Sequence, residues 1–178
     1  MGEFADRLAH LSVRADSPDG HISGHVGGPL QVEIRFQDGA YHSYSESDLG
    51  RQLGQLAAVL WSRYRRGYDE ITAAYRDGEP APYEEPEDVA FRERRAALAV
   101  RGRSPEGWIE ARSRGLVRWE VTVAAGAVRA LTEAEFLAEL DGIVADILRD
   151  WQHEVIVLTE EIYGIGVPDS LRRTPAGP

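Results

Sequence analysis

The chain has 178 residues, of which 43% are hydrophobic, and its 30 acidic residues against 20 basic residues give a net charge of −10. It contains no cysteine, which excludes disulfides, thiol catalysis and cysteine-ligated metals. No stretch approaches the ~20 apolar residues that a membrane span needs, and the N-terminal MGEFADRL lacks the pattern of a signal peptide. We therefore expect a cytoplasmic protein that does not enter the membrane.

All 20 basic residues are arginine, and the chain holds neither lysine nor asparagine. This usage indicates a GC-rich genome, such as that of an actinobacterium, rather than a chemical role for every arginine. A general nucleic-acid-binding protein normally carries a basic face, so the acidic balance weighs against that class.

The first 44 residues predict a short helix followed by three strands. Phe4, Leu8 and Leu11 share one face of a helix, and a Pro-Asp-Gly turn ends at Gly20. From residue 30 to residue 36 apolar and polar residues alternate, which is the pattern of a half-buried strand. The expected elements are a helix over 3–12 and strands over 21–26, 30–36 and 40–44.

A long helix follows, and its start is predicted at Ser45, which forms a capping-box pattern with Asp48. Apolar residues then recur at helical spacing for about thirty residues, or roughly 45 Å. Residues 77–88 hold three prolines, six carboxylates and no basic residue, and this composition predicts an extended, solvated linker.

The second half predicts the same order of elements. Its long helix begins at Thr132, which repeats the capping-box pattern with Glu135. We expect a helix over 91–100, strands over 107–113, 116–123 and 127–131, and a disordered tail over 167–178. The predicted units are therefore residues 1–76 and residues 89–166.

The two halves match without a gap at a separation of 87 residues (104 − 17 = 87), from Ser17–Gly39 against Ser104–Gly126 outward in both directions. Shared residues include Pro18/Pro105, Gly20/Gly107, Ile22/Ile109, Gly28/Gly115, Glu33/Glu120 and Gly39/Gly126. This agreement indicates a tandem duplication. A unit of about 85 residues buries too little surface to be very stable alone, so we expect the two units to share a core as the subunits of a homodimer would.

The sequences ISGHVGGPLQVEIRF and YSESDLGRQLGQLAAVL in the first half, with RSRGLVRWEVTV and LTEAEFLAELDGIVADIL in the second, resemble the YbaB/EbfC family. That resemblance implies an α+β fold of two tandem α-β-β-β-α units, a single-chain pseudo-dimer with antiparallel sheets and long C-terminal helices. The family consists of small nucleoid-associated, DNA-binding bacterial proteins that form homodimers. Actinobacterial YbaB-like proteins linked to type VII secretion act as cytoplasmic chaperones or adaptors, and the resemblance is compatible with that branch too.

Two clusters of arginine are candidates for nucleic-acid binding, because arginine and aromatic side chains together suit phosphate contacts and base stacking. One lies among aromatic residues of the first long helix, and the other spans residues 91–118, where eight arginines face three glutamates (8 − 3 = +5). The alternative is that these arginines pair with the acidic helix of the other unit. The candidates are Arg63, Arg65, Arg66, Arg92, Arg94, Arg95, Arg112 and Arg114.

The two long helices differ most toward their ends, where Asp69 and Glu70 correspond to Ile156 and Val157. The second helix is therefore apolar on nearly all sides from residue 155 to residue 158. Either this segment lies deep in the shared core, or it presents a patch to a partner protein. The partner-binding candidates are Val155, Ile156, Val157, Trp61 and Tyr64.

No arrangement of residues indicates catalysis, a cofactor or a metal. His21 and His25 are four residues apart on a predicted strand, about 13 Å, which is too far for one ion. The glycines at 24, 27 and 28 lack the lysine and the helix start of a phosphate-binding loop. We therefore expect a non-enzymatic protein-binding module, with DNA binding through the arginines as the alternative and an enzyme as a distant third.

Overall fold

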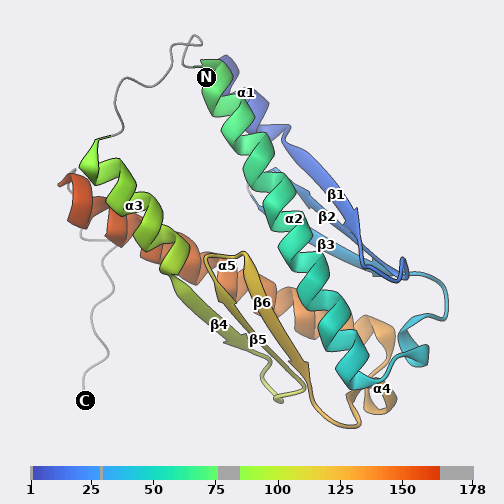
Figure 1. Cartoon of the computed structure of the whole chain (residues 1–178). Coiled ribbons are helices and arrows are strands. Elements are labelled where there is room, and N and C mark those ends of the chain that lie inside the picture. Colours follow the sequence, from blue (N-terminus) through green and yellow to red (C-terminus); the bar gives the residue numbers. More distant parts are fainter. Residues whose placement is uncertain (1, 29, 76–84, 165–178) are drawn as a thin grey trace, which may run out of the picture.

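The computed structural model describes residues 2–28, 30–75 and 85–164. Figure 1 shows a mixed α+β fold with two antiparallel sheets and two long helices. The elements of the first half are α1 (Glu3–Ala9), β1 (Ser12–Asp16), β2 (Ile22–Gly27), β3 (Gln31–Phe36), the 3-10 helix η1 (Tyr41–Ser43) and α2 (Glu46–Tyr75). Those of the second half are α3 (Pro86–Ala97), β4 (Ala99–Arg103), β5 (Ile109–Arg114), β6 (Arg118–Val123), α4 (Ala127–Ala130) and α5 (Glu133–Tyr163).

The two sheets have the orders β1-β2-β3 and β4-β5-β6, and their registers are identical. Every residue pair of the first sheet recurs 87 positions later in the second. For example, Val13 pairs with Val26, and Val100 pairs with Ser113 (100 − 13 = 87; 113 − 26 = 87). Because a slip of one residue would turn each apolar face toward solvent, this register keeps the same positions facing inward in both sheets.

The turns that join the first two strands of each sheet are built in the same way. The buried hydroxyl of Ser17 accepts a hydrogen bond from the Ile22 amide at 2.9 Å, and that of Ser104 accepts one from the Ile109 amide at 3.1 Å. Gly20 and Gly107 close these turns with φ of 76° and 75°. Glycine takes this left-handed conformation without steric cost.

Three strands in each half were expected, and two of them are confirmed: β2 and β3 in the first half, and β5 and β6 in the second. Strands β1 and β4 were missed, because their segments were assigned to the first helix and the turn. The predicted strands over 40–44 and 127–131 are wrong, since these segments form η1 and α4. In the first of them Tyr41 is buried and Tyr44 is half-buried, and a spacing of three residues brings both to one side of a helical turn.

Both long helices and both of their starts are confirmed. The helices α2 and α5 have 30 and 31 residues. The Asp48 amide donates to the Ser45 hydroxyl at 3.1 Å, and Thr132 forms a full capping box with Glu135. Each cap satisfies an amide that the first turn leaves without a partner.

The boundaries of the short helices differ from the prediction. The first ends at Ala9, and the second begins at Pro86, inside the predicted linker, where proline suits the first helical position. A hydrogen bond of 2.7 Å from Tyr163 to Asp88 ties this helix to α5. The rest of the predicted linker up to residue 84, and the predicted tail over 167–178, lie outside the described residues.

Helix α2 connects the two sheets. It packs against β1 and β2 of the first sheet and runs closely along β6 of the second (Figure 1). The close approach depends on Gly50 and Gly54, which are both buried. A Cβ added at Gly50 would overlap the carbonyl oxygen of Val121, and one added at Gly54 would lie 3.4 Å from the carbonyl oxygen of Trp119.

The two long helices meet in a shared core. The buried rings of Trp61 on α2 and Trp151 on α5 pack edge to face with centroids 5.0 Å apart. Near the helix starts, Phe136 packs against Phe36 and Tyr41 of the first half, with centroid distances of 6.2 and 5.2 Å. The core is therefore continuous between the halves.

Replacing Gly50 with alanine tests the contact between α2 and β6. We expect a loss of about 2 kcal/mol in the free energy of unfolding, because the new methyl group must push the helix off the strand. Gly142→Ala is the matched control, since it lies within α5 and a Cβ there meets nothing within 4 Å. The control should gain up to about 1 kcal/mol from helix propensity. Urea denaturation measures both, and a stabilised Gly50→Ala would contradict the close contact.

Candidate functional site

The candidate site is an apolar pocket of about 90 Å³ between the two sheets and the two long helices. Its sixteen lining residues are all apolar: Val26, Leu30, Val32, Ile34, Leu53, Ala57, Leu60, Trp61, Ala111, Trp119, Val121, Leu140, Ile143, Val144, Ile147 and Leu148. A cavity of this character excludes water and accepts apolar groups. The sequence did not predict it, because its walls come from six elements and the loop before β3, and no single stretch marks it.

Half of the pocket's lining residues are only half-buried, so the pocket has a side that solvent can reach. Val32 and Ile34 of β3 and Val144 and Leu148 of α5 are among them. We assign the mouth of the pocket to the space between β3 and α5, because these two elements pack against each other less extensively than α2 and β6 do.

An exposed carboxylate, Asp141 of α5, stands beside this mouth. Burial of the carboxyl group raises its pKa, and the negative charge of Glu33 on β3 raises it further. Glu33 itself pairs with Arg35 at 3.3 Å. The negative charge at the mouth is therefore that of Asp141, and together with the apolar side chains it suits a partner that carries apolar residues and a basic residue.

The predicted partner-binding residues divide between the core and its edge. Trp61 is buried, and Tyr64 stacks on it and donates a hydrogen bond of 3.4 Å to the Gly28 carbonyl. Val155, Ile156 and Val157 are half-buried. Val155 packs against the core, while Val157 borders a shallow depression between α3 and α5.

The predicted arginines of the helices make contacts within the protein. Arg63 donates to the Arg14 carbonyl, Arg65 lies 3.8 Å from Asp69, and Arg94 pairs with Glu161. The guanidinium of Arg95 lies 5.0 Å from the centroid of the Trp151 ring. Burial lowers the pKa of Arg95, and the nearby charge of Arg65 lowers it further. Arg66 is exposed on α2, and Arg92 is exposed on α3, where it makes a contact of its own.

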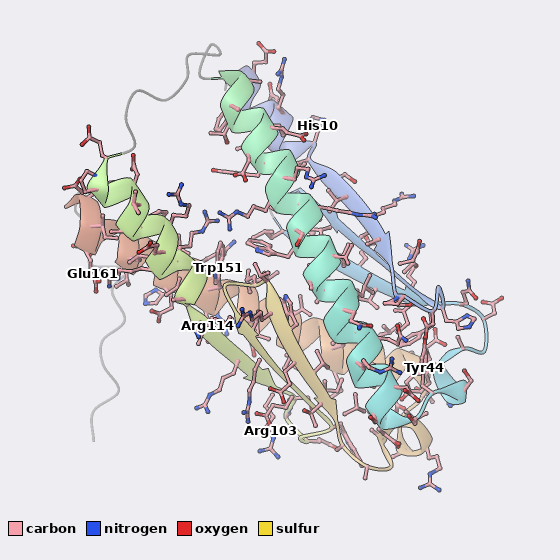
Figure 2. All side chains as sticks on the ribbon, viewed as in Figure 1. His10, Tyr44, Arg103, Arg114, Trp151 and Glu161 are labelled. Carbon is pink, nitrogen blue, oxygen red and sulfur yellow. The ribbon has the colours of Figure 1, made fainter. Side chains whose placement is uncertain are left out.

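The remaining predicted arginines lie on the outer face of the second sheet. Arg112 and Arg114 of β5 are exposed there beside Arg101 and Arg103 of β4 and Arg118 of β6. Figure 2 labels Arg103 and Arg114 on this sheet. Arg112 donates to Glu110 at 2.7 and 2.9 Å, whereas the other four form no ion pair with any described residue. We call these five residues the arginine face.

The described part of the chain holds no group of three or more metal-binding side chains, and no helix in it is long and apolar enough to cross a membrane. His21 contacts Gln37 at 3.0 Å, and His25 contacts Ser12 at 2.8 Å.

Comparison of the chain with protein-family models, with curated proteins and with solved structures finds no match. The structure alone therefore defines the class: a mixed α+β protein with two antiparallel three-stranded sheets and a long C-terminal helix.

The charge at the mouth predicts how stability changes with pH. The pKa of Asp141 is raised in the folded protein, so the folded state binds this proton more tightly than the unfolded state does. The stabilisation from the protonated carboxyl group is fully present at low pH and is lost as pH rises through the folded pKa. Asp141→Asn should therefore raise the melting temperature at pH 7, and the gain should vanish near pH 3. Asp146→Asn on the same helix is the control, because it removes an ion pair of 2.6 Å with Arg149 and should give no gain at pH 7. Equal gains for both variants would contradict this assignment.

Proposed function

We propose that this chain is a non-enzymatic protein-interaction module, an adaptor or chaperone, built as two YbaB-like units that form a pseudo-dimer in one polypeptide. The observation that carries the proposal is the apolar pocket between the halves, whose mouth opens between β3 and α5. Type VII secretion is the setting that the YbaB-like resemblance favours for this role, and the cytoplasm is the compartment.

The duplication is supported by features that recur at the 87-residue separation. They include the identical strand registers, the two serine turns and three glycine pairs with positive φ: Gly20/Gly107, Gly28/Gly115 and Gly39/Gly126. Similar turns alone would not reproduce every strand pair of one sheet at the same separation of 87 residues in the other. Packing of α2 along β6 supports the pseudo-dimer, because it places a helix of one unit against a strand of the other.

Protein binding is supported by the composition of the mouth. Apolar surface that remains accessible in a folded protein marks sites of interaction more often than chance exposure does. A protein segment could place an apolar side chain in the pocket. Its burial would stabilise the complex by about 25 cal/mol for each Å² of apolar surface removed from water.

Filling the pocket tests this proposal. Ala57→Leu adds an apolar side chain at a pocket-lining position and avoids burying a polar group, so the fold should keep or gain stability. The purified variant is immobilised and exposed to an extract of its own host. The amount of each specifically retained host protein should fall by about tenfold or more relative to the wild type. Ala58→Leu is the control, since Ala58 is also half-buried but lies outside this pocket. Equal retention by both variants, with melting temperatures unchanged, would contradict binding through the pocket.

DNA binding is the second candidate, and the arginine face is the observation that favours it. In a chain with a net charge of −10, five exposed arginines against Glu110 and Glu120 give the outer face of the second sheet a charge of +3 (5 − 2 = 3). The outer face of the first sheet balances Arg14 and Arg35 with Asp16 and Glu33, so it is neutral when its histidine is uncharged. Guanidinium groups on an open sheet could contact successive phosphates.

A gel shift with duplex DNA at increasing salt distinguishes this second function. If DNA is the ligand, the double variant Arg101→Ala and Arg114→Ala should bind more weakly, with the salt slope reduced by about 1 for each lost phosphate contact. The matched control is Arg14→Ala with Arg35→Ala on the first sheet, which should bind as the wild type does. Undetectable or salt-insensitive binding by the wild-type chain would exclude this candidate.

A further inference from the structure

Strands β3 and β6 are the corresponding edge strands of the two sheets. Each has backbone amides and carbonyls that point sideways, away from the neighbouring strand. The Gln37 amide donates to the His21 carbonyl at 2.9 Å, so this pair is hydrogen-bonded, and pairs alternate from there along an antiparallel ladder. Phe36, Ile34 and Val32 are therefore non-hydrogen-bonded positions whose amides and carbonyls point outward. The bond from the Ala124 amide to the Trp108 carbonyl gives the same result for Val123, Val121 and Trp119 of β6.

The edge of β6 is covered. The carbonyl oxygens of Val121 and Trp119 are the atoms nearest to Gly50 and Gly54 of α2, which confirms that they point out of the sheet toward that helix. The missing side chains at these glycines let the helix backbone lie against the strand. No extended segment can add to this edge while α2 remains in place.

The edge of β3 is different, because the corresponding positions of α5 are Leu137 and Asp141 (50 + 87 = 137; 54 + 87 = 141). Side chains of this size hold a helix farther from a strand than glycine does. Accordingly, α5 meets β3 through Phe136 and Phe36 at one end and packs against the strand much less extensively than α2 packs against β6. The outward amides and carbonyls of Val32, Ile34 and Phe36 have no backbone partner among the described residues.

The free edge of β3 and the apolar pocket adjoin each other. Val32 and Ile34 contribute their outward backbone groups to the edge and their side chains to the pocket wall. A strand added beside β3 would continue the sheet, and every second side chain would point into the same space toward α5. The geometry thus combines main-chain hydrogen bonds for affinity with a pocket for side-chain selection.

We propose that β3 accepts an extended segment of a partner protein as a fourth strand, whose α5-facing side chains are apolar except for one basic residue beside Asp141. Asp141 selects the basic side chain, since its position on α5 lies between the pocket-lining Leu140 and Val144 and it has no cationic partner among the described residues. This inference rests on the proposed protein-binding function and specifies the conformation and chemistry of the bound segment.

The test uses three synthetic eight-residue peptides and the full chain labelled with ¹⁵N. One peptide alternates valine with threonine and has lysine in place of one valine of the α5-facing set, the second has glutamate in place of that lysine, and the third is the first with its central valine N-methylated. The lysine peptide should shift the amide resonances of Val32, Ile34 and Phe36 and slow their hydrogen exchange, while the amides of β6 stay unchanged. The N-methylated peptide should bind about tenfold more weakly, because methylation removes a backbone donor and blocks close pairing.

Charge reversal supplies the matched variants. Asp141→Lys lies at an exposed position and should reverse the preference, so that the glutamate peptide binds more tightly than the lysine peptide. Glu120→Lys, at the exposed position of β6 that corresponds to Glu33, should leave the preference unchanged (33 + 87 = 120). Either an N-methylated peptide that binds as well as its parent or β3 amides that do not respond at millimolar lysine peptide would overturn strand addition.

The two proposals fail in different ways. If Ala57→Leu releases host proteins but the lysine peptide neither binds β3 nor competes with them, protein binding stands and strand addition is wrong. If the peptide binds β3 and no host protein depends on the pocket, strand addition stands as a property of the edge and the adaptor function is wrong.

Discussion

The arrangement of the two halves depends on one contact between main chains, that of α2 with β6. Helices usually meet sheets through side chains, but here two buried glycines remove the side chains that would hold the helix away from the strand. Glycine weakens a helix interior by up to about 1 kcal/mol at each position. The contact offsets that cost by covering a strand edge and by fixing the second sheet against a helix that also packs on the first.

This contact makes the two sides of the molecule unequal, although the sheets share one register. Where α2 covers β6, the strand edge is sealed. Where α5 crosses β3, larger side chains keep the elements apart, and the remaining space becomes the apolar mouth with Asp141 beside it. The outer faces also differ, since the second sheet carries the arginine face and the first carries balanced charges. Specific surfaces thus arise where corresponding positions hold different residues.

The sequence was sufficient to predict the elements with strong periodicity. The long helices, their caps and the central strands all have clear spacing signals, and each was found within a few residues. Strands β1 and β4 were missed because each is only five residues long and has a single fully buried position, Ala15 or Val100. The strand predicted over 116–123 begins at Arg118, which leaves Val117 outside it and 47% exposed.

The site was harder to predict than the fold. Whether a helical arginine is free for a ligand depends on partners elsewhere in the chain, as Arg94 with Glu161 and Arg95 with Trp151 show. The pocket depends on distances between elements more than a hundred residues apart, such as Val32 and Leu148. Gly50 and Gly54 were visible in the sequence, yet their meaning required knowing that β6 lies beside them.

The covalent continuity of the chain has a thermodynamic consequence for the packing of α2 along β6. Between separate subunits such a contact would weaken on dilution, because association is a bimolecular equilibrium. Within one polypeptide it is unimolecular, and its occupancy is the same at nanomolar and at micromolar protein. The joint between the halves is therefore insensitive to expression level, and a scarce protein can keep it fully formed.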